Sequence, residues 1–415
     1  MSLAKLLSLD VDFLQSMMEK TEPEVKINAF KTSLGSKRGD NYTSMLYRIT
    51  LYGENRWTKG LIYKCLPDNT QARNTYKSEM LFNNEVTFYM RSYTAFTEYQ
   101  EVKQLIQPFN SVPKCYLAQS DTVILEDMQC KGFTMFDRIK GLDFNHCKAI
   151  LRTLGKFHGL SLSMKVDEPD KFKECVSDAI NEVYYRSENE LWYKGYYKQA
   201  AENAEKMLES ELTEDEKPKY LDKFRKFVNM HESFFGYMAE IVKPKEPLAV
   251  LCHGDCWTNN FLFQYSKDGG DISEVSIVDF QVARYGSPAM DLVSLLYCCT
   301  SVELRKQHFT ELLEEYYDSI IGFLTQTNCL SHYPDVRQKI DEEILKYNLF
   351  GLGVALDMIP IITCDSAQAP DMYAKDTTNP DEEPTKEPYP VMTTSDQCRR
   401  MITDLVKELV DNGRL

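Results

Sequence analysis

The sequence predicts an α+β protein of two lobes, a small lobe built on an antiparallel sheet and a larger, mostly helical lobe. Three observations support this prediction. The chain has 415 residues, which is too long for one small core. Strand-like alternation characterises residues 42–67 and 114–128, and helical periodicity characterises most of the chain from residue 143 onwards. We therefore expect one unit over 1–128 and a second over 129–415.

The small lobe contains four predicted strands and one predicted helix. "YTSMLYRITLYG" (42–53) and "TKGLIYKCLP" (58–67) alternate as half-buried strands do, and "KCYLAQSDTVILEDM" (114–128) supplies two more around a turn. Residues 78–96 carry an apolar helical face between the two pairs. The N-terminal run "MSLAKLLSLDVDF" is interrupted by two aspartates, so it predicts the start of a helix rather than an export signal.

The large lobe is predicted to consist of helices around one short strand. Apolar side chains recur with helical spacing over 143–164, and further helices are expected over about 178–209 and 217–242. The apolar run "VSIVDF" (275–280) predicts a strand. Residues 366–392 are rich in Pro, Asp, Glu and Thr, which favours a long mobile loop.

Composition excludes several classes of protein. The formal charge of −15 argues against a nucleic-acid-binding protein, which would carry a basic face. The most apolar segment, 344–363, contains Lys346 and Asp357, so a buried helix is favoured over a membrane span. Twelve cysteines without a regular spacing favour reduced thiols and a cytoplasmic protein. Nothing in the sequence indicates an obligate protein partner.

The stretch "LCHGDCWTNNFLF" (251–263) concentrates chemically active side chains. A zinc site using Cys252, His253 and Cys256 lacks the fourth ligand that a closed site needs. A thiol nucleophile requires a base in a suitable position, and adjacency of Cys252 to His253 does not supply one. Chemistry carried by the carboxylate and amide side chains of the same stretch has better support, because suitable partners occur elsewhere in the chain.

The partners of this stretch predict an ATP-dependent phosphotransferase. Asp255 would orient or deprotonate a hydroxyl group, while Asn260 and Asp279, at the tip of the predicted strand, would hold a divalent cation. Lys64 lies on a predicted strand and Glu85 on the following helix, as expected of a phosphate-binding lysine and its carboxylate partner. The hairpin start Gly39–Ser44 can offer backbone N–H groups and hydroxyls to phosphates.

Taken in order, these motifs resemble the insect ecdysteroid kinase-like (CHK kinase-like) family. This family belongs to the small-molecule branch of the protein-kinase-like fold, together with the choline and aminoglycoside kinases. "HGDCWTNNFLF" is similar to the family pattern HGDxWxxNxxF and "VDFQ" to its DFQ. "GDNYTSMLYRITL", "LIYKCLP", "FNNEVTFY" and "ILEDM" match in the same order. The resemblance extends from about residue 39 to at least residue 291.

The resemblance implies a role for each matching position. Asp255 would be the catalytic base, Asn260 and Asp279 would bind Mg²⁺, and Lys64 would contact the ATP phosphates while paired with Glu85. A backbone segment at the junction of the lobes, the hinge, would contact the adenine. The residues expected to bind nucleotide are Gly39, Asn41, Tyr42, Thr43, Ser44, Lys64, Glu126, Asp127 and Met128.

Two departures from protein kinases argue against peptide substrates. Gly254 stands where protein kinases place an Arg that senses a phosphorylated activation loop, and no APE-like segment follows "DFQ". Gln281 replaces the Gly of DFG, which should restrict backbone movement there. The phosphate loop is poor in glycine, with Gly39 alone near its start.

Several neighbouring residues are expected to be structural. His253 should support the catalytic loop, His158 should be a hydrogen-bonded core histidine, and Asp291 should cap a helix or anchor a loop. Trp257 fits a substrate-stacking role and a packing role equally well. Spacing from Asp255 favours Asn260 over Asn259 as the metal ligand.

The acceptor is expected to be a small, largely apolar alcohol. The aromatic run 183–199 and the helical segment 349–360 could form its binding wall as a set, although ordinary helical core is the slightly better interpretation of any single residue. The family resemblance implies an ecdysteroid or related alcohol. Phosphorylation of choline, another amino alcohol or a sugar is the alternative enzyme hypothesis. A nucleotide-binding pseudokinase scaffold is the non-enzymatic one.

Overall fold

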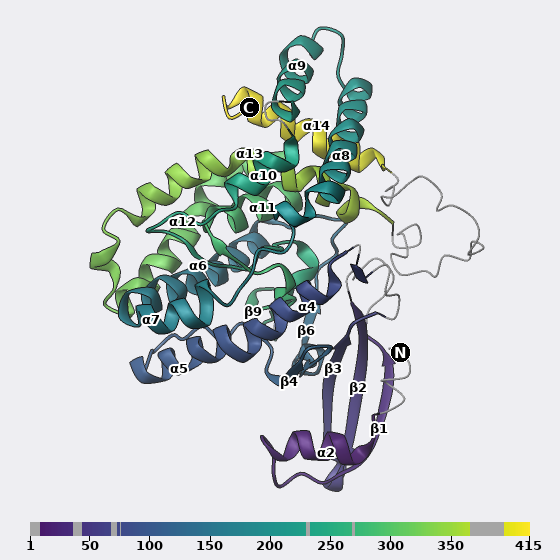
Figure 1. Ribbon diagram of the computed structural model, residues 1–415, viewed down its shortest axis with the longest axis vertical. Coiled ribbons are helices and arrows are strands. Elements are labelled where there is room, and N and C mark those ends of the chain that lie inside the picture. Colours follow the sequence, from purple (N-terminus) through teal and green to yellow (C-terminus); the bar gives the residue numbers. More distant parts are fainter. Residues whose placement is uncertain are drawn as a thin grey trace, which may run out of the picture.

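The computed structural model describes residues 9–35, 44–67, 73–74, 76–229, 233–267, 270–365 and 394–415. The protein has the two predicted lobes, with the sheet of the small lobe at one end and the helices of the large lobe at the other (Figure 1). Residues Gly39, Asn41, Tyr42 and Thr43 and the predicted mobile loop 366–392 lie outside the described residues.

The sheet of the small lobe has five antiparallel strands in the order β1-β2-β3-β5-β4. The strands are β1 (Ile27–Leu34), β2 (Met45–Gly53), β3 (Thr58–Cys65), β4 (Cys115–Gln119) and β5 (Thr122–Glu126). Four of them match the prediction. The prediction that the sheet begins at about residue 41 is wrong, because β1 precedes it. This edge strand buries only Ile27, so it shows little of the alternation that identifies a strand.

Helix α4 (Ser78–Thr87) crosses from the sheet to the large lobe (Figure 1). It continues through a π-helical segment, Phe88–Ser92, into α5 (Tyr93–Lys103), so the predicted helix 78–96 exists and is longer. At the N-terminal end, α2 (Val11–Glu19) packs on the sheet. Its predicted start is explained by Asp10, whose carboxylate accepts a hydrogen bond from the Phe13 N–H at 2.7 Å.

The large lobe is built from helices, as predicted. They are α6 (Phe144–Asp167), α7 (Pro169–Phe172), α8 (Glu190–Glu211), α9 (Lys217–Val228), α10 (Phe234–Ile241), α11 (Ala289–Cys299), α12 (Val302–Gln326), α13 (Val336–Thr363) and α14 (Asp396–Asp411). The most extensive helix packing joins α6 to α12 and α11 to α13. These two packed pairs of helices support the candidate site.

Two predicted helix ranges were wrong. The helix expected over 178–209 begins at Glu190, because the Asn189 amide donates to the carbonyl oxygens of Val183 and Tyr184 and closes a turn. The helix expected over 217–242 is two helices. The first ends before Asn229, and the second begins after Ser233, whose hydroxyl accepts from the Gly236 N–H at 3.0 Å.

Two small sheets position the loop 251–263. Strand β7 (Val250–Cys252) pairs with β10 (Arg284–Gly286), and β8 (Phe261–Tyr265) lies between β6 (Phe133–Met135) and β9 (Ile272–Ile277). The loop that joins β7 to β8 therefore lies beside the turn that joins β9 to β10. The predicted strand 275–280 corresponds to the second half of β9.

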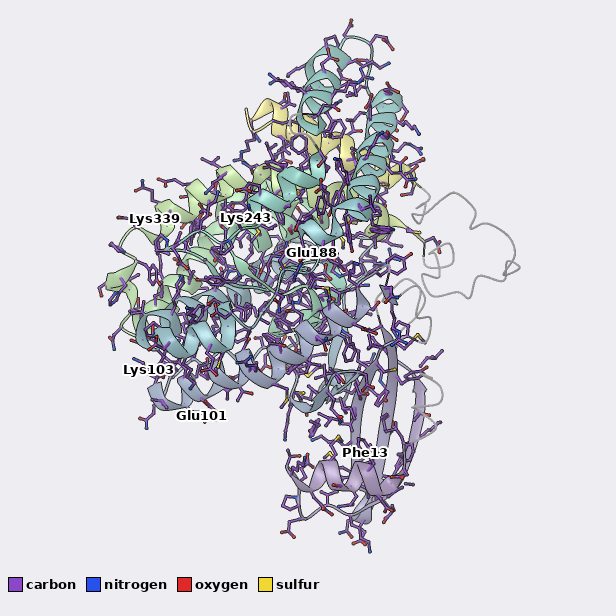
Figure 2. All side chains as sticks on the ribbon, viewed as in Figure 1. Phe13, Glu101, Lys103, Glu188, Lys243 and Lys339 are labelled. Carbon is purple, nitrogen blue, oxygen red and sulfur yellow. The ribbon has the colours of Figure 1, made fainter. Side chains whose placement is uncertain are left out.

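The buried apolar side chains form two separate clusters. A core of twelve residues joins α2 to one face of the sheet and includes Leu61 and Tyr63 of β3. A much larger core fills the helical lobe and extends to Phe82 of α4 and Val123 of β5. The side chains that project from both lobes include charged residues such as Glu101 and Lys243 and the exposed Phe13 (Figure 2).

Within the described part of the chain, one helix is long and apolar enough by length and composition to cross a membrane. It is α13, and 56% of its most apolar window is buried within the lobe. The sequence analysis expected this segment to be a buried helix. Core helices of soluble proteins meet the same criterion, so the finding is weak evidence for a membrane span.

The contact between α6 and α12 depends on a glycine. A Cβ atom at Gly155 would lie 2.7 Å from the Ser319 Cβ and 2.9 Å from the Tyr316 carbonyl oxygen. Only a residue without a side chain allows the two helices to approach this closely.

We expect Gly155→Ala to lower the free energy of unfolding by about 1–3 kcal/mol, because the added methyl group forces the helices apart. Gly322→Ala, on α12 in open space, is the control and should raise it by about 0.5–1 kcal/mol. Urea denaturation of both variants measures the difference. Equal effects of the two substitutions would contradict the close packing.

Candidate active site

Lys64 joins the two lobes through a buried ion triad. It lies on β3 opposite Val123, and only 3% of its surface is exposed. Its Nζ atom is 2.7 Å from Glu85 Oε2 on α4 and 2.8 Å from Asp279 Oδ1 after β9. Burial opposes the positive charge, but the two carboxylates outweigh it and raise the pKa of Lys64. The lysine is therefore held in its charged form.

Glu85 is fully buried, and burial raises its pKa despite the Lys64 charge. Its neighbour Asn84 has a role that the sequence analysis missed. The Asn84 amide donates to the carbonyl oxygens of Gln281 at 3.2 Å and Ala283 at 2.7 Å, so α4 holds the DFQ turn directly. No local signal predicts this bond, because the partners are about 200 residues apart in sequence.

Asp279 occupies a strained position. Its φ of +67° lies in the left-handed region, where a residue with a side chain is uncommon and costs of order 1–3 kcal/mol. The following Phe280 is fully buried and stacks on Phe88, with ring centroids 3.6 Å apart. Packing of Phe280 and the Asn84 bonds keep the turn in place, and the Asp279 side chain remains 24% exposed.

The loop after β7 brings Asp255 and Asn260 together. The Asn260 Nδ2 atom donates to the Asp255 carbonyl oxygen and to Asp255 Oδ2, both at 2.9 Å. Because both partners are acceptors, the amide nitrogen faces Asp255 and the amide oxygen remains available for another ligand. The Val278 N–H donates to the Asn260 carbonyl oxygen at 3.0 Å, which places Asn260 beside Asp279.

Burial and the nearby Asp279 charge raise the pKa of Asp255 to about 7. A carboxylate with this pKa is half ionised near neutral pH, which suits a group that accepts a proton. The hydrogen bond from Asn260 favours the ionised form and partly offsets the effect of burial. The predicted base therefore lies in an environment consistent with its role.

His253 supports this loop, as expected. Its Nε2 is 2.9 Å from the Val278 carbonyl oxygen, and its Nδ1 accepts a bond from the Asp255 N–H at 3.3 Å. This arrangement requires a neutral ring protonated on Nε2. Burial lowers the pKa of His253, which keeps the ring in that form.

Asp291 anchors the loop, as predicted. It lies in the first turn of α11, and its two carboxylate oxygens accept the N–H groups of His253 at 2.7 Å and Gly254 at 2.9 Å. Burial would raise the pKa of Asp291, but hydrogen bonds from His158 and the Gly254 N–H hold it below its usual value. His158 also bonds Tyr316 at 2.9 Å, so it is the satisfied core histidine that the sequence predicted.

The cysteines of the loop are buried. Cys252 and Cys256 are 0% and 3% exposed, and burial raises the pKa of both thiols. Protonated thiols are poor nucleophiles. Cys252 lies within 4.8 Å of His158 and Asp291, but the histidine and aspartate are already hydrogen-bonded to each other and to the core. Trp257 is also buried in the helical core, which supports its packing role.

Asn260 and Asp279 could hold a divalent cation. Their free amide oxygen and partly exposed carboxylate are the hard oxygen ligands that Mg²⁺ prefers. Lys64 occupies one carboxylate oxygen of Asp279 and would lie beside the same cation. The side chains present therefore fit the predicted metal.

The predicted hinge offers few groups to a nucleotide. The Asp127 N–H already donates to the Gly60 carbonyl oxygen at 3.0 Å, and its buried carboxylate pairs with Arg48 at 2.5 Å. Among the described residues, the Met128 N–H has no acceptor and can therefore donate to an adenine ring. Of the predicted phosphate loop, the structure describes Ser44, which is buried at the start of β2.

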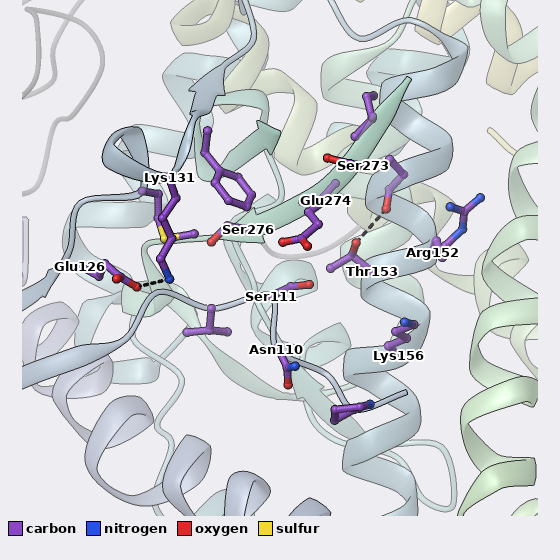
Figure 3. A pocket seen from close by; sticks show the side chains of 17 residues that line it. Asn110, Ser111, Glu126, Lys131, Arg152, Thr153, Lys156, Ser273, Glu274 and Ser276 are labelled. Atoms are coloured by element: carbon purple, nitrogen blue, oxygen red, sulfur yellow. Dashed lines mark hydrogen bonds and ion pairs between the residues drawn. The ribbon is translucent and has the colours of Figure 1, made fainter. Parts of the chain in front are cut away.

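A cavity of about 440 Å³ lies beside the hinge (Figure 3). Glu126 and Met128 line it from the hinge, and Glu126 pairs with Lys131 across 2.7 Å at its rim. Lys64, Glu85, Asp255, Asn260 and Asp279 do not line this cavity. It is therefore separate from the convergent catalytic residues.

A buried lysine shared by two carboxylates, facing an Asp–Asn loop across two lobes, is the arrangement of a kinase-type phosphotransferase site. The model of the ecdysteroid kinase-like family matches residues 38–329, a range that contains all five of these residues. The chain belongs to this family.

One curated relative and three solved structures illustrate the similarity to known proteins. A Caenorhabditis elegans protein described as the uncharacterized oxidoreductase dhs-27 is 23% identical over 309 residues, 68% of this chain. The chain spans only 34% of that relative's length. The structures are a type I macrolide 2'-phosphotransferase, the amicoumacin kinase hAmiN in complex with AMP-PNP, Ca²⁺ and Ami, and a putative fructosamine-3-kinase from Thermobifida fusca.

The macrolide enzyme is 12% identical with a TM-score of 0.35, and the alignment covers 87% of this chain and 97% of the other. For hAmiN the identity is 12%, the TM-score 0.37 and the coverage 99% and 96%. For the T. fusca protein the identity is 13%, the TM-score 0.34 and the coverage 85% and 99%.

Gly254 cannot carry a side chain. Its φ is +83°, and a Cβ atom there would lie 2.0 Å from the Val282 carbonyl oxygen. We expect Gly254→Ala to displace the catalytic loop from the DFQ segment and to lower the free energy of unfolding by more than about 2 kcal/mol. Denaturant unfolding measures this loss. Native stability of the variant would show that the two segments are not in this contact.

The raised pKa of Asp255 predicts a pH-dependent stability difference. The carboxyl group loses its proton near pH 4 in the unfolded chain and near pH 7 in the folded protein, so the stability of the metal-free wild type falls as the pH rises between these values. We expect Asp255→Asn to be more stable above pH 7, by up to about 4 kcal/mol, and this advantage to vanish near pH 4.

Chemical denaturation at pH 4.5, 6 and 8 in EDTA measures the difference. Asp215→Asn changes an exposed carboxylate of the large lobe and serves as the control. If the free energy of unfolding of Asp255→Asn exceeded that of the wild type by the same amount at every pH, the raised pKa would be contradicted.

Proposed function

We propose that the protein transfers a phosphoryl group from Mg²⁺–ATP to a hydroxyl of a small, largely apolar molecule. The observation that carries this proposal is the convergence of Lys64, Glu85, Asp255, Asn260 and Asp279 from four separate segments. Their charges and hydrogen-bonding groups match the requirements of phosphoryl transfer, in which positioning and electrostatic stabilisation account for most of the catalysis.

Lys64 would bind the ATP phosphates through a charge that Glu85 and Asp279 hold in place. Asn260 and Asp279 would bind Mg²⁺ through their oxygen atoms. A cation held there would supply positive charge to offset the negative charge of the phosphate groups. The Met128 N–H, which lacks an acceptor among the described residues, would recognise the adenine edge.

Asp255 would orient the acceptor hydroxyl and take its proton as the new O–P bond forms. The bond between the γ-phosphorus and the β–γ bridging oxygen of ATP would break in the same step, and ADP would leave. Its pKa of about 7 keeps a fraction of the carboxylate ionised at neutral pH and makes it a stronger base than an exposed aspartate. The Asn260 amide fixes the carboxylate through Oδ2, which leaves Oδ1 for the substrate.

The aromatic side chains of α8 support an apolar acceptor. Trp192 and Tyr196 stack with centroids 5.4 Å apart, and Tyr76 meets Trp192 edge-on at 6.1 Å. Such a surface suits a flat, hydrophobic alcohol. We therefore favour an ecdysteroid or a related alcohol as substrate, with a role in hormone inactivation or detoxification in the cytoplasm.

An amino alcohol such as choline is a second candidate, favoured by one observation. Asp357 places a carboxylate beside the same aromatic side chains, where it could bind a cation. The pseudokinase alternative is disfavoured, because all five predicted catalytic residues are present and converge.

Incubation with Mg²⁺–ATP and a panel of ecdysteroids, choline and phenolic glycosides, followed by mass spectrometry, tests the reaction and its substrate class. We expect phosphorylation of at least one ecdysteroid, and Asp255→Asn should lower kcat by on the order of 10²–10⁴ because the base is lost.

Asp215→Asn is the matched control and should keep wild-type turnover. Absence of a phosphorylated product from every compound, despite nucleotide binding, would count against the proposed reaction. Wild-type turnover of Asp255→Asn would refute the role of Asp255.

A further inference from the structure

Asp357 is an unusual residue in the helix that contains it. It lies near the C-terminal end of α13 and is only partly exposed, while its apolar neighbours Leu356 and Ile359 are 3% and 0% exposed. Its Oδ1 atom accepts a hydrogen bond from the Tyr196 hydroxyl on α8. In the described part of the chain, Oδ2 has no hydrogen-bond donor, and no Lys, Arg or His forms an ion pair with the carboxylate.

The surroundings of Asp357 do not stabilise its charge. Burial raises its pKa to about 6, although the Tyr196 hydrogen bond acts in the opposite direction. Keeping this partly desolvated carboxylate charged without a cationic partner costs free energy in the unliganded protein. A bound molecule that brings its own donor would remove this penalty.

Asp357 lies close to both the catalytic loop and the aromatic side chains. Helix α13, which carries Asp357, packs extensively on α11, and Asp291 of α11 holds the catalytic loop through the backbone N–H groups of His253 and Gly254. Tyr196, its hydrogen-bonding partner, stacks on Trp192. A molecule with one hydroxyl at Asp255 and an apolar skeleton on these rings would therefore bring its distal groups to Asp357.

We propose that Asp357, held by Tyr196, is a specificity-determining residue that binds a second hydrogen-bond donor of the acceptor molecule. The recognised substrate is then an apolar skeleton with two polar groups, the hydroxyl that becomes phosphorylated and a donor that stays unmodified. This donor is a hydroxyl or an ammonium group, because an ionised carboxylate accepts from either. The proposal deepens the proposed function and rests on its assignment of the acceptor site.

Equilibrium binding tests the proposal independently of catalysis. The probes are steroids on one skeleton that carry one or two hydroxyls, and a third compound in which an amine replaces the second hydroxyl, titrated calorimetrically with Mg²⁺–ADP present. We expect wild-type protein to bind a compound with the second donor about 10–100-fold more tightly than the monohydroxy compound, as for a hydrogen bond to a charged group. Comparison of the affinity of the diol with that of the amine shows whether the preferred donor is a hydroxyl or an ammonium group.

Asp357→Asn should reduce this preference to about threefold or less, because the charge is lost while the shape is kept. Tyr196→Phe should reduce it partly, because the carboxylate loses the hydroxyl that positions it. The control is Asp341→Asn, which alters a second Tyr–Asp hydrogen bond on α13, that with Tyr317. Asp341 lies 16 residues before Asp357, about 24 Å along the helix, and the preference should remain at its wild-type value.

An unchanged preference in Asp357→Asn, or no preference in the wild type, would overturn the proposal. Thermal unfolding of each variant verifies that it is folded, and Tyr196→Phe decides the matter if Asp357→Asn does not fold. Phosphorylation of the same compounds is measured separately. A donor preference that depends on Asp357, without any phosphorylated product, would refute the proposed reaction and leave the binding role of Asp357 intact.

Discussion

The ion triad centred on Lys64 is the interaction on which the geometry of the site depends. One lysine from the sheet contacts a carboxylate from α4 and another from the DFQ turn, and water has little access to the lysine and Glu85. Separating such buried charges is unfavourable, because any partner left alone would keep an uncompensated charge in the interior. The three segments are therefore fixed relative to one another before a substrate arrives. This arrangement is the preorganisation that electrostatic catalysis requires.

A second set of contacts fixes the catalytic loop to the helical lobe. Asp291 receives two consecutive backbone N–H groups, and the neutral His253 ring links the loop to the strand that leads to Asp279. The position of Asp255 thus depends on hydrogen bonds to the rigid helical lobe, whereas Lys64 belongs to the sheet. Turnover by the proposed mechanism requires both anchors, one in each lobe.

Contiguous patterns in the sequence identified most of the fold. The alternation in β2 and β3 and the helical spacing in α6 are local properties, so they can be read without knowledge of the tertiary structure. Edge strand β1 was missed because it buries too few side chains to alternate. The helix limits at Glu190 and Asn229 were missed because they depend on particular side-chain hydrogen bonds and caps, which a hydrophobic pattern does not record.

The candidate site was predictable for similar reasons, and only in part. Lys64, Glu85, Asp255, Asn260 and Asp279 occur in recognisable local motifs, and the structure brings them together. Asn84 and Tyr196 carry no local signal, since their partners are distant in sequence. The sequence marked Asp357 only as a polar residue in an apolar segment. Its proximity to Asp255 depends on how α13 packs in the helical lobe.

The division of the interior into two cores has a mechanical consequence for the triad. Lys64 lies on β3, whose Leu61 and Tyr63 belong to the twelve-residue core, whereas α4, which carries Glu85, packs into the large core through Phe82. The shortest ion pair of the triad therefore joins an element of the small core to an element of the large core. Any tilt of the sheet relative to the helices acts directly on this bridge. A ligand that contacts both Lys64 and the helical lobe stabilises the association of the two cores. Ligand affinity and the cooperativity of unfolding are therefore linked properties of this protein.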